Sequence, residues 1–215
     1  MSKPEIIGSL RSTYARAVCM LCEEKGIDYD LTEAMLGAPE LRAIHPFGRM
    51  PVLRHGDVVL FESKAIATYL DLAFDGPRLI PTEPHRAALA EQWISVVNTT
   101  IDRTMIRTFL FAYIGPKVAT DGPDRETILS VMPAVLEQIA VLDRAVAETG
   151  FLVGDAYSFA DINLMPILDR VRLPPDGAQA LAGAPNLSAY YQRHAQRPSF
   201  TRTVPPPGPP SRAAE

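Results

Sequence analysis

The segment from His85 to Ile114 constrains the fold more than any other, because it contains neither glycine nor proline. Apolar side chains recur in it at every fourth residue, at Leu89, Trp93, Val97, Ile101, Met105, Phe109 and Tyr113. Residues with this spacing share one face of a helix, so the segment predicts one long amphipathic helix. Such a helix buries its apolar face against other helices, and we expect it to belong to a helical domain.

Two further helix patterns follow, and with the first they predict an all-helical domain over residues 85–203. Apolar residues recur at helical spacing through residues 129–146. Ser158-Phe159-Ala160-Asp161 has the form of a capping box and opens an apolar helix from Ile162 to Val171. Residues 204–215 include five prolines and little that could be buried, so a disordered tail is predicted there.

The residues before this domain alternate between strand and helix patterns. The expected elements are a strand at Glu5–Gly8, a helix from Ser12 to Lys25 closed by Gly26, a strand at Tyr29–Leu31, strands at Pro51–Arg54 and Val58–Phe61, and a helix from Ser63. The first three suggest a βαβ unit, and the next two flank a turn sequence as a hairpin. Residues 1–77 are therefore predicted to form a thioredoxin-like domain, which makes the fold class α/β plus all-α.

The charge balance and the hydropathy pattern exclude two classes of partner. The chain has 21 Lys and Arg against 25 Asp and Glu, and its net charge of -4 gives no general attraction to nucleic acid or to anionic lipid. No stretch reaches the roughly 20 apolar residues that span a bilayer, and the first ten residues hold too short an apolar run for a signal peptide. We therefore expect a cytoplasmic protein.

Cys19 and Cys22 form a C-x-x-C pair, a spacing typical of thioredoxin-like redox sites. In such sites the first cysteine caps a helix directly after a strand, and the helix N-terminus lowers the pKa of its thiol. Here Ser12 is the better helix cap, so both cysteines fall inside the helix on its apolar face. We therefore predict two buried core thiols rather than a redox pair.

Three motifs, taken in order, resemble cytosolic glutathione transferases. They are His45-Pro46-Phe47-Gly48-Arg49-Met50-Pro51-Val52-Leu53, then Phe61-Glu62-Ser63-Lys64-Ala65-Ile66, then Ser158-Phe159-Ala160-Asp161 with Pro166 behind it. The resemblance covers residues 4–203. It implies an enzyme that conjugates glutathione to hydrophobic electrophiles and that assembles as a homodimer. Ser12, followed by Arg16-Ala17-Val18, is similar to the serine-type theta and phi classes.

The resemblance assigns glutathione to two places in the first domain. It implies a cis peptide bond between Met50 and Pro51, with the Met50 backbone pairing antiparallel with the cysteinyl part of glutathione. It also implies that Ser63, at the start of a helix, binds the γ-glutamyl carboxylate and that Glu62 meets the neighbouring ammonium group. The alternatives are an ordinary trans proline and a plain helix cap beside a solvated Glu62.

Two features around this site depart from the phi pattern. Arg49 stands where phi members usually have Gln, and it either binds a glutathione carboxylate or is solvated. The His-Lys pair expected just before Pro39-Glu40 is Leu36-Gly37 here. The glycyl carboxylate of glutathione therefore lacks its usual contacts.

Ser12 is predicted to carry the chemistry. The attacking species is the thiolate, and lowering the pKa of a thiol by ~2 requires about 2.7 kcal/mol of preferential stabilisation. A hydroxyl hydrogen bond to an anion contributes ~1.5 to 3 kcal/mol and a helix N-terminus ~0.3 to 1 kcal/mol, so no metal is needed. Ser9, Thr13 and Tyr14 are the alternative donors, and Ser12 alternatively serves only as a cap. Arg16 either adds positive potential behind the site or is solvated.

The residues expected to contact the electrophile are Leu10, Arg11, Ile106, Phe109 and Tyr113. For the three on the long helix, the alternative is an ordinary helical core. Arg11, Arg103 and Arg107 favour an anionic substrate unless they are simply solvated. By resemblance to the theta and phi pattern, Asp102 is expected to reach glutathione bound to the partner subunit.

Two other functions remain open from the sequence. A non-catalytic member of the same fold would bind ligands or protein partners without turnover. The other is a glutathione-dependent isomerase or peroxidase, although the isomerase class has Ser-Ser-Cys where this chain has Ser12-Thr13-Tyr14. The resemblance implies glutathione as the co-substrate. No other cofactor is implied, because the four histidines show no metal-ligand spacing and no glycine-rich phosphate loop occurs.

Overall fold

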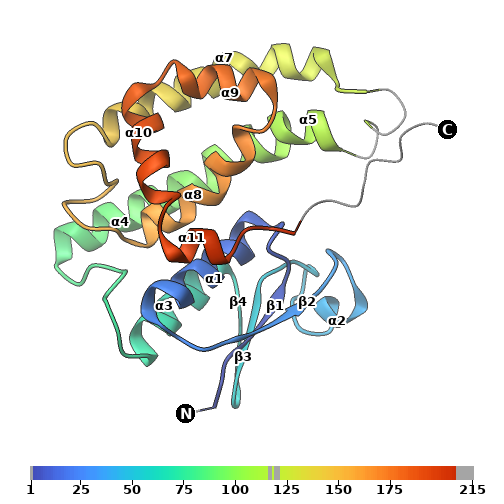
Figure 1. Cartoon of the computed structure of the whole chain (residues 1–215). Coiled ribbons are helices and arrows are strands. Elements are labelled where there is room, and N and C mark those ends of the chain that lie inside the picture. The colour runs from blue at the N-terminus through green and yellow to red at the C-terminus, as the bar shows by residue number, and fades with distance from the viewer. Residues whose placement is uncertain (1, 116–117, 119–121, 207–215) are drawn as a thin grey trace. The chain divides into compact units, whose positions relative to one another are not determined.

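The computed structural model describes residues 2–115, 118 and 122–206. The chain divides into two compact units, whose elements are labelled in Figure 1. The first unit comprises the chain up to Pro77 and the chain from Arg197 onward, and the second comprises Arg78–Gln196. Of the tail expected at 204–215, residues 207–215 lie outside the described residues. Among the described helices, none combines the length and apolar character that crossing a bilayer demands.

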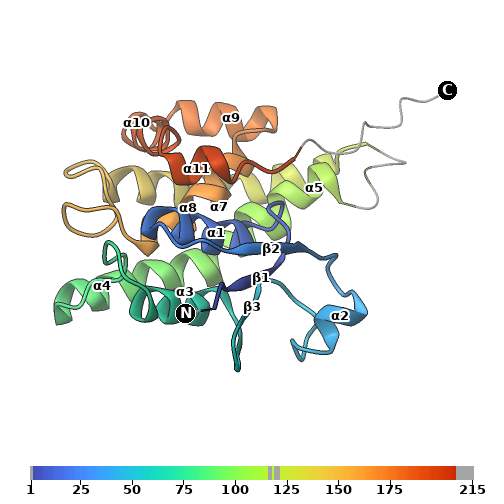
Figure 2. The same cartoon turned by 60° about the horizontal axis from the view of Figure 1, so that its bottom comes forward.

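The first unit contains a four-stranded mixed sheet in the order β2-β1-β3-β4. Figure 2 labels β1, β2 and β3 of this sheet. Its strands are β1 (Glu5–Gly8), β2 (Asp30–Glu33), β3 (Val52–His55) and β4 (Val58–Phe61). β1 is parallel to β2 and antiparallel to β3, and β3 and β4 form an antiparallel hairpin in which Val52 lies opposite Phe61. This is the thioredoxin-like arrangement that the sequence predicts.

Three helices of the first unit pack against this sheet or against one another. They are α1 (Thr13–Lys25), α2 (Pro39–Arg42) and α3 (Ser63–Ala73). α1 packs against β1 and α3, and the side chain of Leu41 in α2 packs with Ile7 and Val52. Because successive strand residues point to opposite faces, Ile7 and Val52 face α2 while Ile6 and Leu53 are buried on the other face.

A short helix from the end of the chain, α11 (Pro198–Arg202), packs on α1 and so belongs to the first unit. Arg197 holds both carboxylate oxygens of Glu24 in α1, at 2.7 and 2.6 Å. The guanidinium carbon of Arg16 lies 4.2 Å from the centre of the Phe200 ring, and its Nη2 donates to the Phe200 carbonyl at 3.3 Å. The helical unit therefore ends at Gln196 rather than at residue 203, because these contacts tie the later residues to α1.

In its described residues the second unit is all-helical, as expected. Its elements are α4 (Pro84–Val96), the π-helical segment η1 (Val97–Leu110), α5 (Phe111–Ile114), α7 (Arg125–Ala145), α8 (Phe159–Val171), α9 (Pro175–Ala182) and α10 (Pro185–His194). The long helix predicted from His85 runs through α4, η1 and α5, but its centre is π-helical rather than α-helical. This wider winding brings residues five apart together, so that Arg107 Nε donates to Asp102 Oδ2 at 2.9 Å.

The capping box predicted at Ser158-Phe159-Ala160-Asp161 begins α8. The fully buried Asp161 carboxylate accepts the backbone N–H of Leu152 at 2.8 Å and that of Ser158 at 2.9 Å. It also accepts the hydroxyl groups of Ser158 and Tyr190, each at 3.0 Å. Burial raises the pKa of this carboxyl group, and the four donors oppose the rise. Asp161 thereby joins α8 to the preceding loop and to α10.

Candidate functional site

The predicted glutathione-site residues of the first unit meet at the carboxyl end of β1. Gly8 ends this strand, and a β-carbon placed on it would lie 3.1 Å from Ala15 Cβ, 3.5 Å from Met50 Cβ and 3.7 Å from Pro51 Cα. Glycine therefore lets the first turn of α1 approach the Met50-Pro51 bond closely. Ser12 begins α1 and consequently lies at the same edge of the sheet as Met50.

Ser12 is the N-cap of α1. Its backbone is extended, with φ -77° and ψ 124°, and its Oγ accepts the backbone N–H of Ala15 at 3.3 Å. A hydroxyl group that accepts one hydrogen bond keeps its own proton to donate. The side chain is half-buried, so its O–H can face a ligand at the positive end of the helix.

The alternative donors have different surroundings. Ser9 and Thr13 are each only 8% exposed, and Ser9 Oγ accepts the backbone N–H of Arg11 at 3.3 Å. Tyr14 is half-buried in the first turn of α1. Of the four side chains, Ser12 is the one that caps the helix while remaining partly exposed, so it is the strongest candidate.

The peptide bond between Met50 and Pro51 is cis, as the resemblance implies. It directly precedes β3, whose first residue, Val52, pairs with Ile7 of β1 and Phe61 of β4. Met50 lies beyond these paired residues, and the described residues supply no hydrogen-bond partner for its backbone groups. An extended ligand can therefore add to the sheet at Met50.

Glu62 precedes α3 with φ 70°, a left-handed conformation that is unusual for a residue with a β-carbon. Its side chain, which is 66% exposed, does not cap the helix, and Glu62 Oε1 lies 3.7 Å from His45 Nε2. In the described part of the chain no side chain caps α3, and Ser63 is buried at its first position. An open helix N-terminus of this kind binds carboxylates through its free backbone N–H groups.

His45 is a site residue that the sequence interpretation missed. Its side chain is 2% exposed, and its ring centre lies 4.7 Å from that of Phe61. Nδ1 accepts the backbone N–H of Phe47 at 3.1 Å, which assigns the proton of the neutral ring to Nε2, the atom that faces Glu62. His45 Nε2 therefore lies beside the Glu62 carboxylate, at a distance longer than a hydrogen bond. The signal in the sequence is that His45 is the first residue of the motif that ends at Leu53. Metal-ligand spacing does not indicate this role.

Arg16 is 1% exposed, so its interpretation as a solvated residue is wrong. It follows Ser12 by four residues in α1, and its backbone N–H donates to the Ser12 carbonyl at 2.9 Å. The two residues therefore share a face of the helix. A buried positive charge thus lies one turn behind the helix N-terminus.

The other predicted residues of the first unit lie around this edge. Leu10 is half-buried, and Arg11 is exposed, with Nη2 donating to the Pro206 carbonyl at 3.5 Å. Arg49 is exposed, and its guanidinium carbon lies 6.0 Å from the centre of the Phe47 ring. These positions leave the contact of Arg49 with a glutathione carboxylate as a prediction.

The predicted electrophile contacts of the second unit lie on η1 and α5. Ile106 and Phe109 are 5% and 0% exposed, and the rings of Phe109 and Tyr113 meet edge to face with centres 5.4 Å apart. Tyr113 donates its hydroxyl proton to Asp176 of α9, and Arg125 of α7 donates to the same carboxylate at 2.9 Å. Partial burial and the Asp176 carboxylate raise the pKa of Tyr113. Phe109 therefore belongs to the core of this unit, and the substrate contacts of all three stay predictions.

Asp102 of η1 is 5% exposed, and one of its two carboxylate oxygens accepts a hydrogen bond. Its Oδ2 accepts from Arg107, whereas its Oδ1 has no hydrogen-bond partner among the described residues. A buried carboxylate oxygen without a donor is costly to stability. The contact with glutathione of the partner subunit remains a prediction. Arg107 is paired with Asp102, and Arg103 is exposed.

Cys19 and Cys22 are fully buried and free. Burial raises the pKa of the Cys19 thiol to about 12 and raises that of Cys22 well above its usual value. Neither thiol ionises near neutral pH, so the prediction of core thiols is confirmed.

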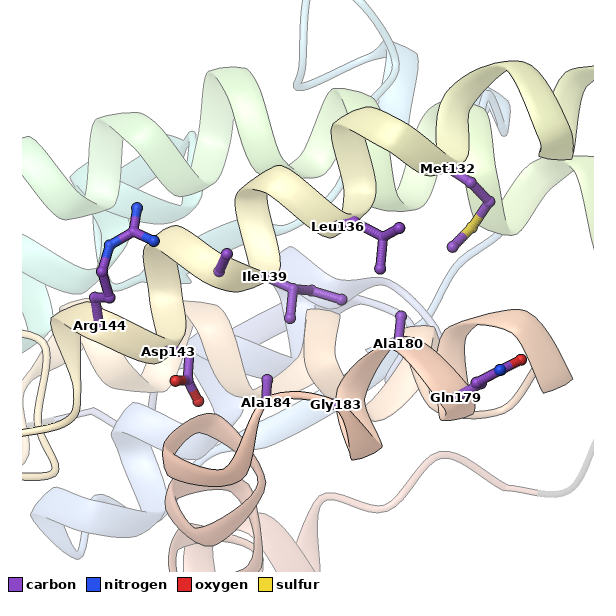
Figure 3. A pocket seen from close by; sticks show the side chains of 10 residues that line it. Met132, Leu136, Ile139, Asp143, Arg144, Gln179, Ala180, Gly183 and Ala184 are labelled. Atoms are coloured by element: carbon purple, nitrogen blue, oxygen red, sulfur yellow. The ribbon is translucent and has the colours of Figure 1, made fainter.

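The second unit carries a surface pocket of 540 Å³ between α7 and α9. Figure 3 shows Leu136 and Ile139 of α7 and Ala180 of α9 around it, with Asp143 toward one end. None of the predicted site residues lines this pocket. All of its lining residues belong to the second unit.

Comparison with known proteins decides the family. Residues 6–78 match the family model described as glutathione S-transferase, N-terminal domain, and residues 102–198 match the C-terminal domain of the same family. Glutathione S-transferase 3 of Zea mays is 30% identical over 226 residues, which cover 100% of both chains. The chain belongs to the glutathione S-transferase family.

Solved structures of other glutathione S-transferases share its fold. Glutathione transferase F7 from Populus trichocarpa superposes with a TM-score of 0.84 at 25% identity, covering 93% of this chain and 97% of that one. The theta class glutathione S-transferase of Xanthomonas axonopodis pv. citri, solved with glutathione bound, has a TM-score of 0.81 at 28% identity, covering 95% and 98%. As a transferase of this family, the chain uses glutathione as a substrate. Within its described residues no cluster of three or more His, Cys, Asp or Glu could hold a metal ion.

Proposed function

We propose that this glutathione S-transferase ionises the glutathione thiol through the Ser12 hydroxyl and conjugates the thiolate to hydrophobic electrophiles. The observation that carries the proposal is the hydrogen bond at 3.3 Å from the Ala15 N–H to Ser12 Oγ, which leaves the hydroxyl proton to donate at the N-terminus of α1. The close approach of Ala15 and Met50 around Gly8 supports it, because a cysteinyl group paired with Met50 would present its sulfur to that helix end.

In the proposed reaction the thiol proton passes to solvent and the thiolate accepts the O–H of Ser12. The sulfur then forms a bond to an electrophilic carbon, and the electron pair moves to a leaving group or into the electrophile. The buried charge of Arg16 adds to the positive potential of the helix end, which favours the anion over the thiol. Cys19 and Cys22 have no part in this step.

The γ-glutamyl group is proposed to occupy the open N-terminus of α3. Its carboxylate would accept the backbone N–H and hydroxyl of Ser63, and its ammonium group would meet the Glu62 carboxylate, which lies 3.7 Å from His45 Nε2. The positive end of α3 would thus face the carboxylate of the ligand, and the negative Glu62 side chain would face its ammonium group.

Replacing either residue of this γ-glutamyl site is expected to weaken glutathione binding more than it weakens the fold. Glu62→Gln and Ser63→Ala should each raise the Kd about tenfold, because each removes one charge-assisted contact with the ligand. Isothermal titration calorimetry measures the Kd, and the melting temperature reports the fold. Glu148→Gln, at an exposed turn of the second unit, is the matched control. An unchanged Kd in both variants would remove the proposed γ-glutamyl site.

The electrophile is proposed to contact Leu10, Arg11, Ile106 and Tyr113, and Phe109 is proposed to support Tyr113 from the core of its unit. A turnover screen with glutathione against chlorinated aromatics, isothiocyanates, hydroperoxides and maleyl compounds tests the catalytic part of the proposal. Conjugation of an apolar electrophile supports it, and peroxide reduction or maleyl isomerisation alone would favour the peroxidase or isomerase. Retention on immobilised glutathione without turnover of any compound would instead indicate a non-catalytic binding protein.

We further propose a cytoplasmic homodimer with a role in detoxification. Both cysteines are free, which is typical of a reducing compartment, and the resemblance to the theta and phi pattern places Asp102 toward glutathione of the partner subunit. Sedimentation velocity at micromolar concentration should give the mass of two chains. The mass of one chain, unchanged by added glutathione, would contradict the homodimer.

A further inference from the structure

The segment that leads into Met50 carries one arginine at the end of α2 and one in the loop after it, and we propose that Arg42, acting with Arg49, binds the glycyl carboxylate of glutathione. This assignment rests on the proposed function, because it takes the γ-glutamyl and cysteinyl groups to lie at Ser63 and Met50. It gives this chain its own replacement for the contacts that Leu36-Gly37 cannot make.

The register of the sheet fixes the direction of the ligand. Val52 of β3 lies opposite Phe61 of β4, so the residues that follow Phe61 lie beside Pro51, on the C-terminal side of Met50. A γ-glutamyl group bound at Ser63 therefore occupies that side. A ligand that pairs antiparallel with Met50 then extends its glycine the other way, back along the chain toward Gly48. One extended residue spans about 3.3 Å, so the glycyl carboxylate comes within reach of side chains around Gly48 and Arg49.

Arg42 is fixed at this place by two glycines. The Gly37 N–H donates to the Gly48 carbonyl at 3.0 Å, which joins the two ends of the loop. Arg42 Nε donates to the Gly37 carbonyl at 3.1 Å, and a β-carbon on Gly48 would lie only 2.9 Å from Arg42 Cγ. The stem of Arg42 thus lies along Gly48, two residues before Met50.

The helix that carries Arg42 is anchored to the same sheet. Leu41, its neighbour in α2, is fully buried in a cluster with Ile7 and Val52, against which Met50 also packs. The position of Arg42 relative to Met50 is therefore set by core packing rather than by a free surface loop.

The chemistry of the two arginines suits a carboxylate. Arg42 donates from Nε to the Gly37 carbonyl, so both of its Nη atoms can donate to a ligand. Within the described chain, neither Arg42 nor Arg49 forms an ion pair with Asp or Glu. A guanidinium group presents paired donors that match the two oxygens of a carboxylate. The two groups together supply the charge that the glycyl end of the ligand requires.

The test compares glutathione with its glycyl monoethyl ester, which lacks only the glycyl charge, by isothermal titration calorimetry. The wild-type protein is expected to bind glutathione about tenfold more tightly than the ester, which is the size of one charge-assisted hydrogen bond. Arg42→Gln should raise the Kd of glutathione about fivefold while changing that of the ester less than about twofold, because Arg49 keeps part of the preference. The double variant with Arg49→Gln should bind both compounds equally. Arg54→Gln, an exposed arginine at the far end of β3, is the matched control.

The ratio of the two Kd values within one variant separates contact from folding. If Arg42→Gln weakens both compounds equally, Arg42 only holds the loop and the assignment is overturned. The assignment also falls if the wild-type protein does not distinguish the ester from glutathione. Failure of the wild-type protein to bind either compound would refute the proposed function itself, and the glycyl assignment with it.

Discussion

Ser12→Ala is expected to lower the rate of glutathione conjugation about 30-fold at neutral pH, because it removes one charge-assisted hydrogen bond of ~2 kcal/mol to the thiolate. Glutathione affinity should change little, since the proposed binding contacts come from Glu62, Ser63 and the Met50 backbone. The pKa of the bound thiol should rise, so the pH-rate profile should move upward by about 1.5 pH units. Ultraviolet absorbance of the thiolate, titrated in the glutathione complexes of both proteins, measures this change directly.

The same substitution removes the cap of α1, so its structural effect has to be separated from its chemical one. Loss of the Ala15 N–H bond to Ser12 Oγ should cost about 1 kcal/mol of unfolding free energy. Ser12→Thr keeps both a cap and a hydroxyl donor and should retain the low thiol pKa. Coincident titration curves for wild type and Ser12→Ala would reduce Ser12 to a helix cap. The donor would then be sought with Ser9→Ala, Thr13→Val and Tyr14→Phe.

The sequence predicts the first unit well because its signals are local. β1 and β4 have the expected bounds, α1 begins after its cap at Ser12, and Gly26 closes it with φ 69°. Each of these features depends on a residue's own backbone preference or on a partner within one turn. The motifs around Met50 and Glu62 likewise lie in single short segments, so their resemblance to glutathione transferases could be read without knowledge of the fold.

The features that the sequence does not predict depend on distant partners or on helix winding. Arg16 is buried because Phe200, 184 positions later, covers it, and α11 joins the first unit for the same reason. His45 acquires its role only when β4 brings Glu62 next to it. The π-helical winding of η1 keeps apolar residues on one face, as an α-helix does, so periodicity alone cannot reveal it. Arg42 becomes a candidate only when Gly37 and Gly48 are seen to pair.

Asp161→Ala is expected to be the most destabilising of the substitutions discussed. Four donors converge on this carboxylate at 2.8 to 3.0 Å, and all four would lose their partner inside the protein. Breaking such a buried network costs roughly 3 to 5 kcal/mol of unfolding free energy. In a chain of this size that loss lowers the melting temperature by about 10 °C or more, which differential scanning calorimetry would measure.

Two further variants test whether the loss of stability comes from the buried hydrogen-bond network of Asp161. Asp161→Asn keeps the size of the side chain but turns one acceptor into a donor, which faces other donors, so it should recover only part of the stability. Asp155→Ala removes a carboxylate that is 75% exposed and pairs with Arg86 at 3.0 Å, and it should have far less effect. Equal melting temperatures for the Asp161 and Asp155 variants would show that the buried network contributes no more than a surface pair. Below the unfolding transition, the Asp161 variants should still bind glutathione with a Kd close to that of the wild type, because the proposed contacts at Met50, Glu62 and Ser63 all belong to the first unit.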